Sequence, residues 1–109
     1  MKRIVWEGSS RRDVRTFPSE ARADIGYQLY RVQLGLEPSD FKSMSSVAHN
    51  VREIRIHAGN EYRVLYIAGF KEAIYVLHVL DKKTQKTPKQ DIELAKKRFG
   101  ELIHRSKSA

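Results

Sequence analysis

The chain has 109 residues, and its 21 lysine and arginine residues against 13 aspartate and glutamate residues give a formal net charge of +8. It has no cysteine, which excludes a disulfide framework, a cysteine nucleophile and a thiolate metal site. This length suits a single domain, residues 1–109, and the basic excess is typical of proteins that bind nucleic acid, although a solubilising basic surface has the same composition. The sequence shows no signal-peptide pattern and no apolar run of about 20 residues, so we expect a cytoplasmic protein without a membrane span.

The first third of the chain predicts a strand followed by two helices. Residues 3–6 are typical of a short strand, and Ser9 or Ser10 is a suitable N-cap for a helix over residues 10–17. Pro18 discourages continuation of that helix. Apolar residues at helical spacing then predict a longer helix over residues 19–34, which Gly35 ends.

The middle of the chain predicts a loop and an antiparallel meander. Residues 37–50 are polar and indicate a loop, with a short turn near residues 40–42. Residues 51–56, 62–67 and 73–80 favour strands, and short connections make them hairpin neighbours. The third run is almost wholly apolar, which is typical of a strand buried on both faces.

The last element predicted is a C-terminal helix. Thr87 at the N-cap, Pro88 at the first helical position and Gln90 at the third form a capping-box pattern for a helix over residues 88–104. Residues 105–109 are expected to be a disordered tail. The predicted order is β-α-α-β-β-β-α, an α+β fold in which the two early helices cover one face of a four-stranded, mostly antiparallel sheet. The opposite face is expected to be free and functional.

Charged residues on the predicted strands are the first candidates for chemistry. Arg63 lies in an otherwise apolar strand, where a guanidinium is costly unless it is paired or faces an open polar site. Glu53 and Arg55 are two residues apart and share a face of the neighbouring strand. Either Arg63 is a phosphate clamp beside them, or these residues form an ordinary cross-strand ion pair.

A lysine-rich segment provides the second set of candidates. Lys82, Lys83 and Lys86 precede the N-terminus of the last helix, where ammonium groups and backbone N–H groups together favour an anion. A solvated basic loop is the alternative. His78 is expected to be structural, and His49, His57 and His104 lack metal-ligand spacing, so no metal site is predicted. Strand tyrosines either pack in the core or stack on a base; they are Tyr62, Tyr66 and Tyr75.

Three segments in this order resemble the RelE/ParE toxin superfamily, and in particular its phage-related HigB-like branch. They are E-x-R at residues 53–55, Y-R-V-x-Y at residues 62–66 and K-K-x-x-K-T-P at residues 82–88. The resemblance covers nearly the whole chain. It implies a RelE-like fold and a toxin of a type II toxin–antitoxin system that cuts mRNA on the ribosome. It further implies cleavage by attack of the RNA 2′-hydroxyl, without a metal or cofactor.

The resemblance also implies roles for individual residues. Arg63 is expected to hold the scissile phosphate, with Lys82 or Lys83 as a second catalytic cation. The expected RNA-binding residues are Arg55, Lys86, Glu53 and Tyr66. Many relatives carry a tyrosine or histidine near the C-terminus for proton transfer, and residues 88–104 have no clear equivalent. A lysine with its pKa lowered by basic neighbours is one candidate base.

Two other functions and several partners remain open from the sequence. The chain is alternatively a ParE-like, non-enzymatic gyrase poison or a phage nucleic-acid-binding protein without catalysis. If the protein is an mRNA endonuclease, the expected partners are the ribosome with mRNA and a cognate helix-turn-helix antitoxin. That antitoxin either masks the basic face or docks on the early helices, with Tyr27 and Tyr30 as anchors, unless these tyrosines complete the protein's own core. The oligomeric state is not predicted.

Overall fold

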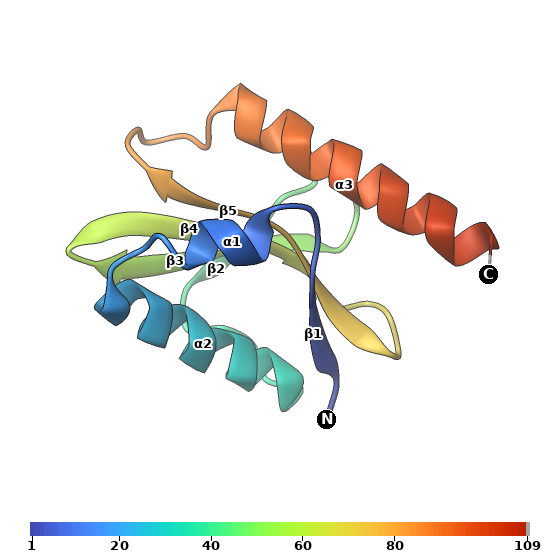
Figure 1. Cartoon of the computed structure of the whole chain (residues 1–109), viewed down its shortest axis with the longest axis horizontal. Helices are drawn as coiled ribbons and strands as arrows, with labels where there is room; N and C mark the ends of the chain where they lie inside the picture. The colour runs from blue at the N-terminus through green and yellow to red at the C-terminus, as the bar shows by residue number, and fades with distance from the viewer. Residues whose placement is uncertain (109) are drawn as a thin grey trace.

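The computed structural model describes residues 1–108. Over this range the element order is β-α-α-β-β-β-β-α (Figure 1). The elements are β1 (Arg3–Trp6), α1 (Ser10–Val14), α2 (Ser19–Gln33), β2 (Phe41–Ser43), β3 (Val51–Ala58), β4 (Asn60–Ile67), β5 (Ala73–Lys82) and α3 (Lys89–Ser108). The α+β class follows the prediction, while the number of strands does not.

Within residues 1–108 the strands form one five-stranded sheet in the order β1-β5-β4-β3-β2. The strands β3, β4 and β5 form the predicted antiparallel meander, and β1 adds to β5 in parallel. Gly59 permits the tight turn between β3 and β4 because its φ of 81° lies in the left-handed region. That turn fixes the register in which Arg55 pairs with Arg63 and His57 pairs with Glu61.

The strand β2 corrects the prediction of a loop over residues 37–50. Phe41, Lys42 and Ser43 pair with Ile54, Glu53 and Arg52 at the edge of the sheet. The ring of Phe41 lies 4.6 Å from the Arg52 guanidinium, a cation–π contact that covers this edge. Three residues are too few to show the alternation by which a strand is recognised in a sequence, so only the tertiary pairing reveals it.

The helices α1 and α2 cover one face of the sheet, as predicted (Figure 1). In α2 the buried residues recur every three or four positions and pack on the sheet; they are Ala21, Ile25, Leu29 and Val32. The ring of Phe17, just after α1, contacts Tyr62 with 4.8 Å between centroids. The α-helical parts end at Val14 and Gln33, earlier than the predicted ends at residues 17 and 34.

The opposite face is only partly free, which corrects the second expectation. There α3 packs over one end of the sheet, with Ala95 and Leu102 in a core cluster that includes Leu65 and Leu77 (Figure 1). The helix continues to Ser108, so the predicted disordered tail is wrong for residues 105–108; residue 109 lies outside the described residues. The periodic apolar stripe ends at Leu102, which is why the polar last turns gave no helical signal.

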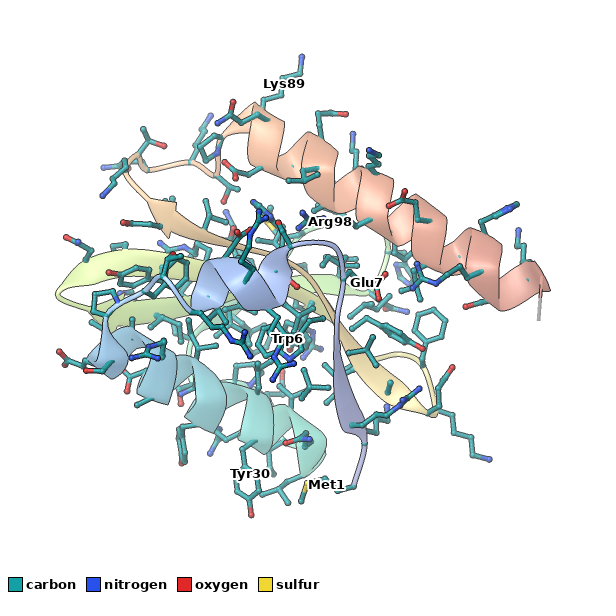
Figure 2. The ribbon with its side chains drawn as sticks, viewed as in Figure 1. Met1, Trp6, Glu7, Tyr30, Lys89 and Arg98 are labelled. Carbon is teal, nitrogen blue, oxygen red and sulfur yellow. The ribbon has the colours of Figure 1, made fainter. Side chains whose placement is uncertain are left out.

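A buried polar network fixes α3 to the sheet. A register shift at Leu65 and Tyr66 leaves Leu77 as an extra residue in β5, and His78 accordingly reaches Asp91 of α3 at 2.6 Å. Arg98 is 7% exposed and donates to the Leu77 carbonyl oxygen at 3.0 Å and to the Ser9 hydroxyl at 2.9 Å. Arg98 therefore connects α3 with β5 and with the start of α1 (Figure 2).

Candidate active site

The part of the sheet that α3 leaves uncovered is polar and hollow. At the ends of β3, β4 and β5, a depression of about 510 Å³ opens on this face. Its lining includes Arg55, His57, Glu61, Arg63, Lys82 and Lys83, with the Thr84–Gln85 turn beside them. Antiparallel pairing puts these strand residues on one face, because alternate residues of each strand share a side.

Arg63 is the central cation of the depression. It is 5% exposed, and its Nη1 atom donates to the Tyr62 carbonyl oxygen at 2.9 Å and to the Glu61 carboxylate at 3.3 Å. Its Nε atom is buried and has no hydrogen-bond acceptor among the described residues. Arg55 stands directly opposite on β3. Like charges facing each other across two strands are unfavourable, so this pair of arginines favours a bound anion.

Glu53 supports Arg63 from beneath. Its side chain is 0% exposed, and its Oε1 atom lies 3.6 Å from Arg63 Nε. Its Oε2 atom accepts a 2.5 Å hydrogen bond from the Thr87 hydroxyl. The helix α3 begins at Lys89, two residues after Thr87, so Thr87 does not occupy the predicted N-cap position. Glu53 was predicted to bind RNA, but it is inaccessible to a ligand. It holds Arg63 in place and ties the lysine-rich loop to β3.

Lys82 lies at the base of the depression and is 9% exposed. Burial, together with the charge of Arg63, lowers the pKa of this ammonium. It forms no ion pair within the described part of the chain. Lys83 is exposed and pairs with Asp81 at 3.0 Å, while Lys86 is exposed and does not line the depression. The structure therefore separates the three lysines into one buried and two exposed groups.

Tyr66 lies on the opposite side of the sheet. It is 2% exposed in the core beneath α2, and burial raises the pKa of its hydroxyl. There it borders a second depression, of about 490 Å³, near the C-terminal end of α2. The cations of that depression are already engaged, because Arg52 pairs with Glu37 at 3.5 Å and Lys2 donates to the Ala68 carbonyl oxygen at 2.7 Å. Tyr66 therefore does not contact a ligand bound in the depression beside Arg63, which corrects its predicted role in RNA binding.

His57 is a site residue that sequence reasoning missed. Its ring lies between the carboxylates of Asp40 and Glu61, with 2.7 Å to each. These hydrogen bonds, first with Asp40 and then with Glu61, raise the pKa of His57, and the same contact lowers the pKa of Glu61. The sequence carried one signal for this contact, since Gly59 predicts a tight turn that pairs residue 57 with residue 61.

Two further features of the described residues bear on the site. Residues 1–108 contain no helix that is long and apolar enough to cross a membrane. The histidine and carboxylate side chains in this part of the chain form no group of three or more that is suited to hold a metal ion. The depression is thus characterised by its arginine and lysine cations and by the hydrogen-bonded His57.

Comparison with known proteins gives the family. The family of phage-derived Gp49-like proteins (DUF891) matches residues 12–100, which include every strand and helix except β1, part of α1 and the end of α3. No curated protein matches the chain. The Gp49-like family is related to toxin–antitoxin systems. Since the match covers most of the 109 residues, the chain belongs to this Gp49-like family, within the RelE/HigB-like toxin superfamily.

Proposed function

We propose that the protein is the toxin of a type II toxin–antitoxin system, of the phage-related HigB-like branch, and that it cleaves mRNA on the ribosome. The observation that carries the proposal is the convergence of Arg55, Arg63 and Lys82 in one open depression. Arg63 and Lys82 are nearly buried there; Arg63 lies between Glu61 and Glu53, whereas Lys82 forms no ion pair among the described residues. This combination suits a phosphodiester, whose charge would replace the exposed Glu61 carboxylate beside Arg63 and provide the counter-ion that Lys82 lacks.

The proposed reaction divides the work between the two buried cations. Arg63 holds the scissile phosphate and stabilises the additional negative charge of the transition state. Lys82 accepts the proton of the attacking 2′-hydroxyl, a role that requires a neutral amine. Burial beside Arg63 favours that neutral form by lowering the pKa of Lys82. Arg55 and Lys83 contact neighbouring phosphates at the rim of the depression.

Two partners follow from this proposal. The ribosome presents the mRNA, and a cognate helix-turn-helix antitoxin neutralises the toxin in the cell that makes it. Tyr27 and Tyr30 of α2 are 56% and 46% exposed, so they do not complete the protein's own core. They lie on the other side of the sheet from the basic depression. We therefore favour docking of the antitoxin on this helix over direct masking of the depression.

The decisive experiment is induction of the protein alone, followed by mapping of mRNA 5′ ends with and without a translation inhibitor. The expected result is new ends inside translated frames that disappear when translation is blocked before induction. A folded Arg63→Ala variant should leave the transcripts intact, and Arg22→Ala, an exposed arginine on α2, should cleave normally. Intact transcripts together with trapped gyrase–DNA complexes would instead establish a ParE-like poison.

A further inference from the structure

His57 occupies an unusual position at the rim of the depression. It is near the end of β3, and its side chain is 55% exposed. Its Nε2 atom lies 2.7 Å from Asp40 Oδ2, and its Nδ1 atom lies 2.7 Å from Glu61 Oε2. A neutral imidazole carries a proton on one nitrogen only, and the other nitrogen would then face a carboxylate lone pair. Two such short contacts therefore require the doubly protonated, cationic ring.

The surrounding charges maintain this state. The groups that face His57 are Asp40, from the segment before β2, and Glu61, from β4. Behind them, Arg55 of β3 lies 4.0 Å from Asp40, and Arg63 of β4 lies 3.3 Å from Glu61. Hydrogen bonds with the two carboxylates raise the pKa of His57 against the opposing effect of burial. The two carboxylates therefore favour the cationic ring, which can donate a proton.

Glu61 bridges His57 and the central arginine. One carboxylate oxygen, Oε2, contacts His57 Nδ1, while the other, Oε1, contacts Arg63 Nη1 at 3.3 Å. A phosphodiester offers two oxygens in a similar O–X–O arrangement. The Glu61 side chain is 43% exposed and can swing into solvent. The carboxylate thus occupies the position that a phosphate group would take between the two cations.

We propose that His57 is the general acid of this site: an RNA phosphodiester displaces the Glu61 carboxylate, and the freed Nδ1–H of His57 protonates the departing 5′-oxygen. This inference rests on the proposed nuclease function. The 2′-oxygen forms a bond to phosphorus as its proton passes to the neutral amine of Lys82. The bond from phosphorus to the 5′-oxygen breaks, and its electron pair takes the proton from His57. The products are a 2′,3′-cyclic phosphate and a 5′-hydroxyl.

Asp40 has a supporting part in this step. It keeps its hydrogen bond to Nε2 when Glu61 leaves, so it fixes the orientation of the ring and favours the cationic form. Asp40 is therefore a positioning residue. The arrangement also supplies a proton donor within the chain's own strands, where the sequence of α3 offered no clear equivalent of the C-terminal tyrosine or histidine.

The test compares two leaving groups in single-turnover cleavage of ribosome-bound mRNA. One substrate has the natural 5′-oxygen at the cleaved linkage, and the other has sulfur in that bridging position. A thiolate leaves without protonation, so loss of a general acid affects only the oxygen substrate. His57→Ala should lose about 100-fold or more in rate on the oxygen substrate and remain close to wild type on the sulfur substrate. The exposed His49 provides the control, and His49→Ala should match wild type on both.

The outcomes separate the two proposals. Equal losses by His57→Ala on both substrates, or no loss on either, would overturn the role of His57 while leaving the nuclease proposal intact. A wild-type protein that cuts neither substrate would overturn both. If circular dichroism shows that His57→Ala is unfolded, the test uses His57→Gln instead and compares the pH dependence of its cleavage rate with that of the wild type. A general acid must be protonated, so the wild-type rate should fall as pH rises through the pKa of His57, and His57→Gln should lack this fall.

Discussion

Arg63 combines burial with incomplete pairing, which is costly for a guanidinium. Its hydrogen bonds with Tyr62 and Glu61 use only part of its donor capacity, and the Glu53 carboxylate lies beyond hydrogen-bond distance of its Nε atom. Folding alone rarely retains a buried donor without an acceptor. An incoming phosphate that displaces the exposed Glu61 carboxylate would accept from Nη1 in its place.

Substitution of Arg63 tests this directly. Arg63→Ala should reduce the cleavage rate by about 100-fold or more, because it removes a contact that strengthens as charge develops on the phosphate. Arg63→Lys should restore only part of the activity, since an ammonium cannot make a bidentate contact. The measurement is single-turnover cleavage, with circular dichroism to verify folding. A folded Arg63→Ala protein of unchanged activity would remove Arg63 from the site.

Some of the site residues could be placed from the sequence alone, and others could not. The convergence of Arg55 with Arg63 was predictable, because side-chain alternation and a tight turn determine both face and register. The same alternation places Tyr66, three residues after Arg63, on the other face, and the prediction overlooked this parity. The burial of Lys82 was not predictable, because it depends on how the loop before α3 folds back through the Thr87–Glu53 hydrogen bond.

At the level of elements, locally periodic segments were predicted and those that depend on distant partners were not. The apolar spacing of α2 repeats every three or four residues, and short turns connect β3, β4 and β5, so both features can be recognised from short stretches of sequence. By contrast, β2 exists through its pairing with β3, and the last turns of α3 extend past the apolar stripe. In these turns Arg105 pairs with the buried Glu7 at 2.7 Å, a partner 98 residues earlier in the chain.

The attachment of α3 provides the second prediction. Arg98→Met keeps the length of the side chain but leaves the Leu77 carbonyl, the Ser9 hydroxyl and His78 without their shared donor. We expect a loss of about 2–4 kcal/mol in the free energy of unfolding. Urea denaturation measures this loss. Gly8→Ala should act in the same direction, because a Cβ there collides with the Arg98 guanidinium.

The control is an exposed cation on the same helix. Lys96 forms only a surface pair with Glu93 at 3.5 Å, so Lys96→Met should change stability by less than about 0.5 kcal/mol. Similar losses for Arg98→Met and Lys96→Met would mean that the buried network does not hold α3 in place.

The outer face of α2 carries the third prediction. Tyr27 and Tyr30 are followed by Leu34 and Leu36, which are 50% and 49% exposed, and Tyr30 points away from the sheet (Figure 2). Exposed aromatic side chains at helical spacing are typical anchors of a protein interface. Changing Tyr27 and Tyr30 together to serine should weaken antitoxin binding by about 30-fold or more and leave mRNA cleavage unchanged. Titration with the product of the neighbouring reading frame measures the affinity, and Arg22→Ala provides a control on the same helix.

At the scale of the whole molecule, the sheet separates two surfaces of different character. One carries the exposed tyrosines and leucines of α2 and its C-terminal end, and the other carries the basic depression. Apolar contacts depend little on ionic strength, whereas contacts between cations and phosphates depend on it steeply. A protein of net charge +8 is also steered toward polyanions at long range. The two proposed partners are therefore distinguishable by salt alone.

For a single-stranded RNA, the logarithm of affinity falls linearly with the logarithm of salt concentration. Each phosphate contact makes the slope of this line more negative by about 0.7. The cations that line the depression are Arg55, Arg63, Lys82 and Lys83. Four contacts predict a slope of roughly −3 for an oligoribonucleotide that carries a 2′-O-methyl group at the cleavage position, so that it binds without being cut. Arg55→Ala should weaken binding and make the slope shallower by about 0.7, whereas Arg22→Ala should leave it unchanged.

The antitoxin complex, measured over the same salt range, should show a slope much closer to zero. A steep slope for the antitoxin, lost in Arg55→Ala, would instead place the antitoxin on the depression and exclude α2 as its principal contact.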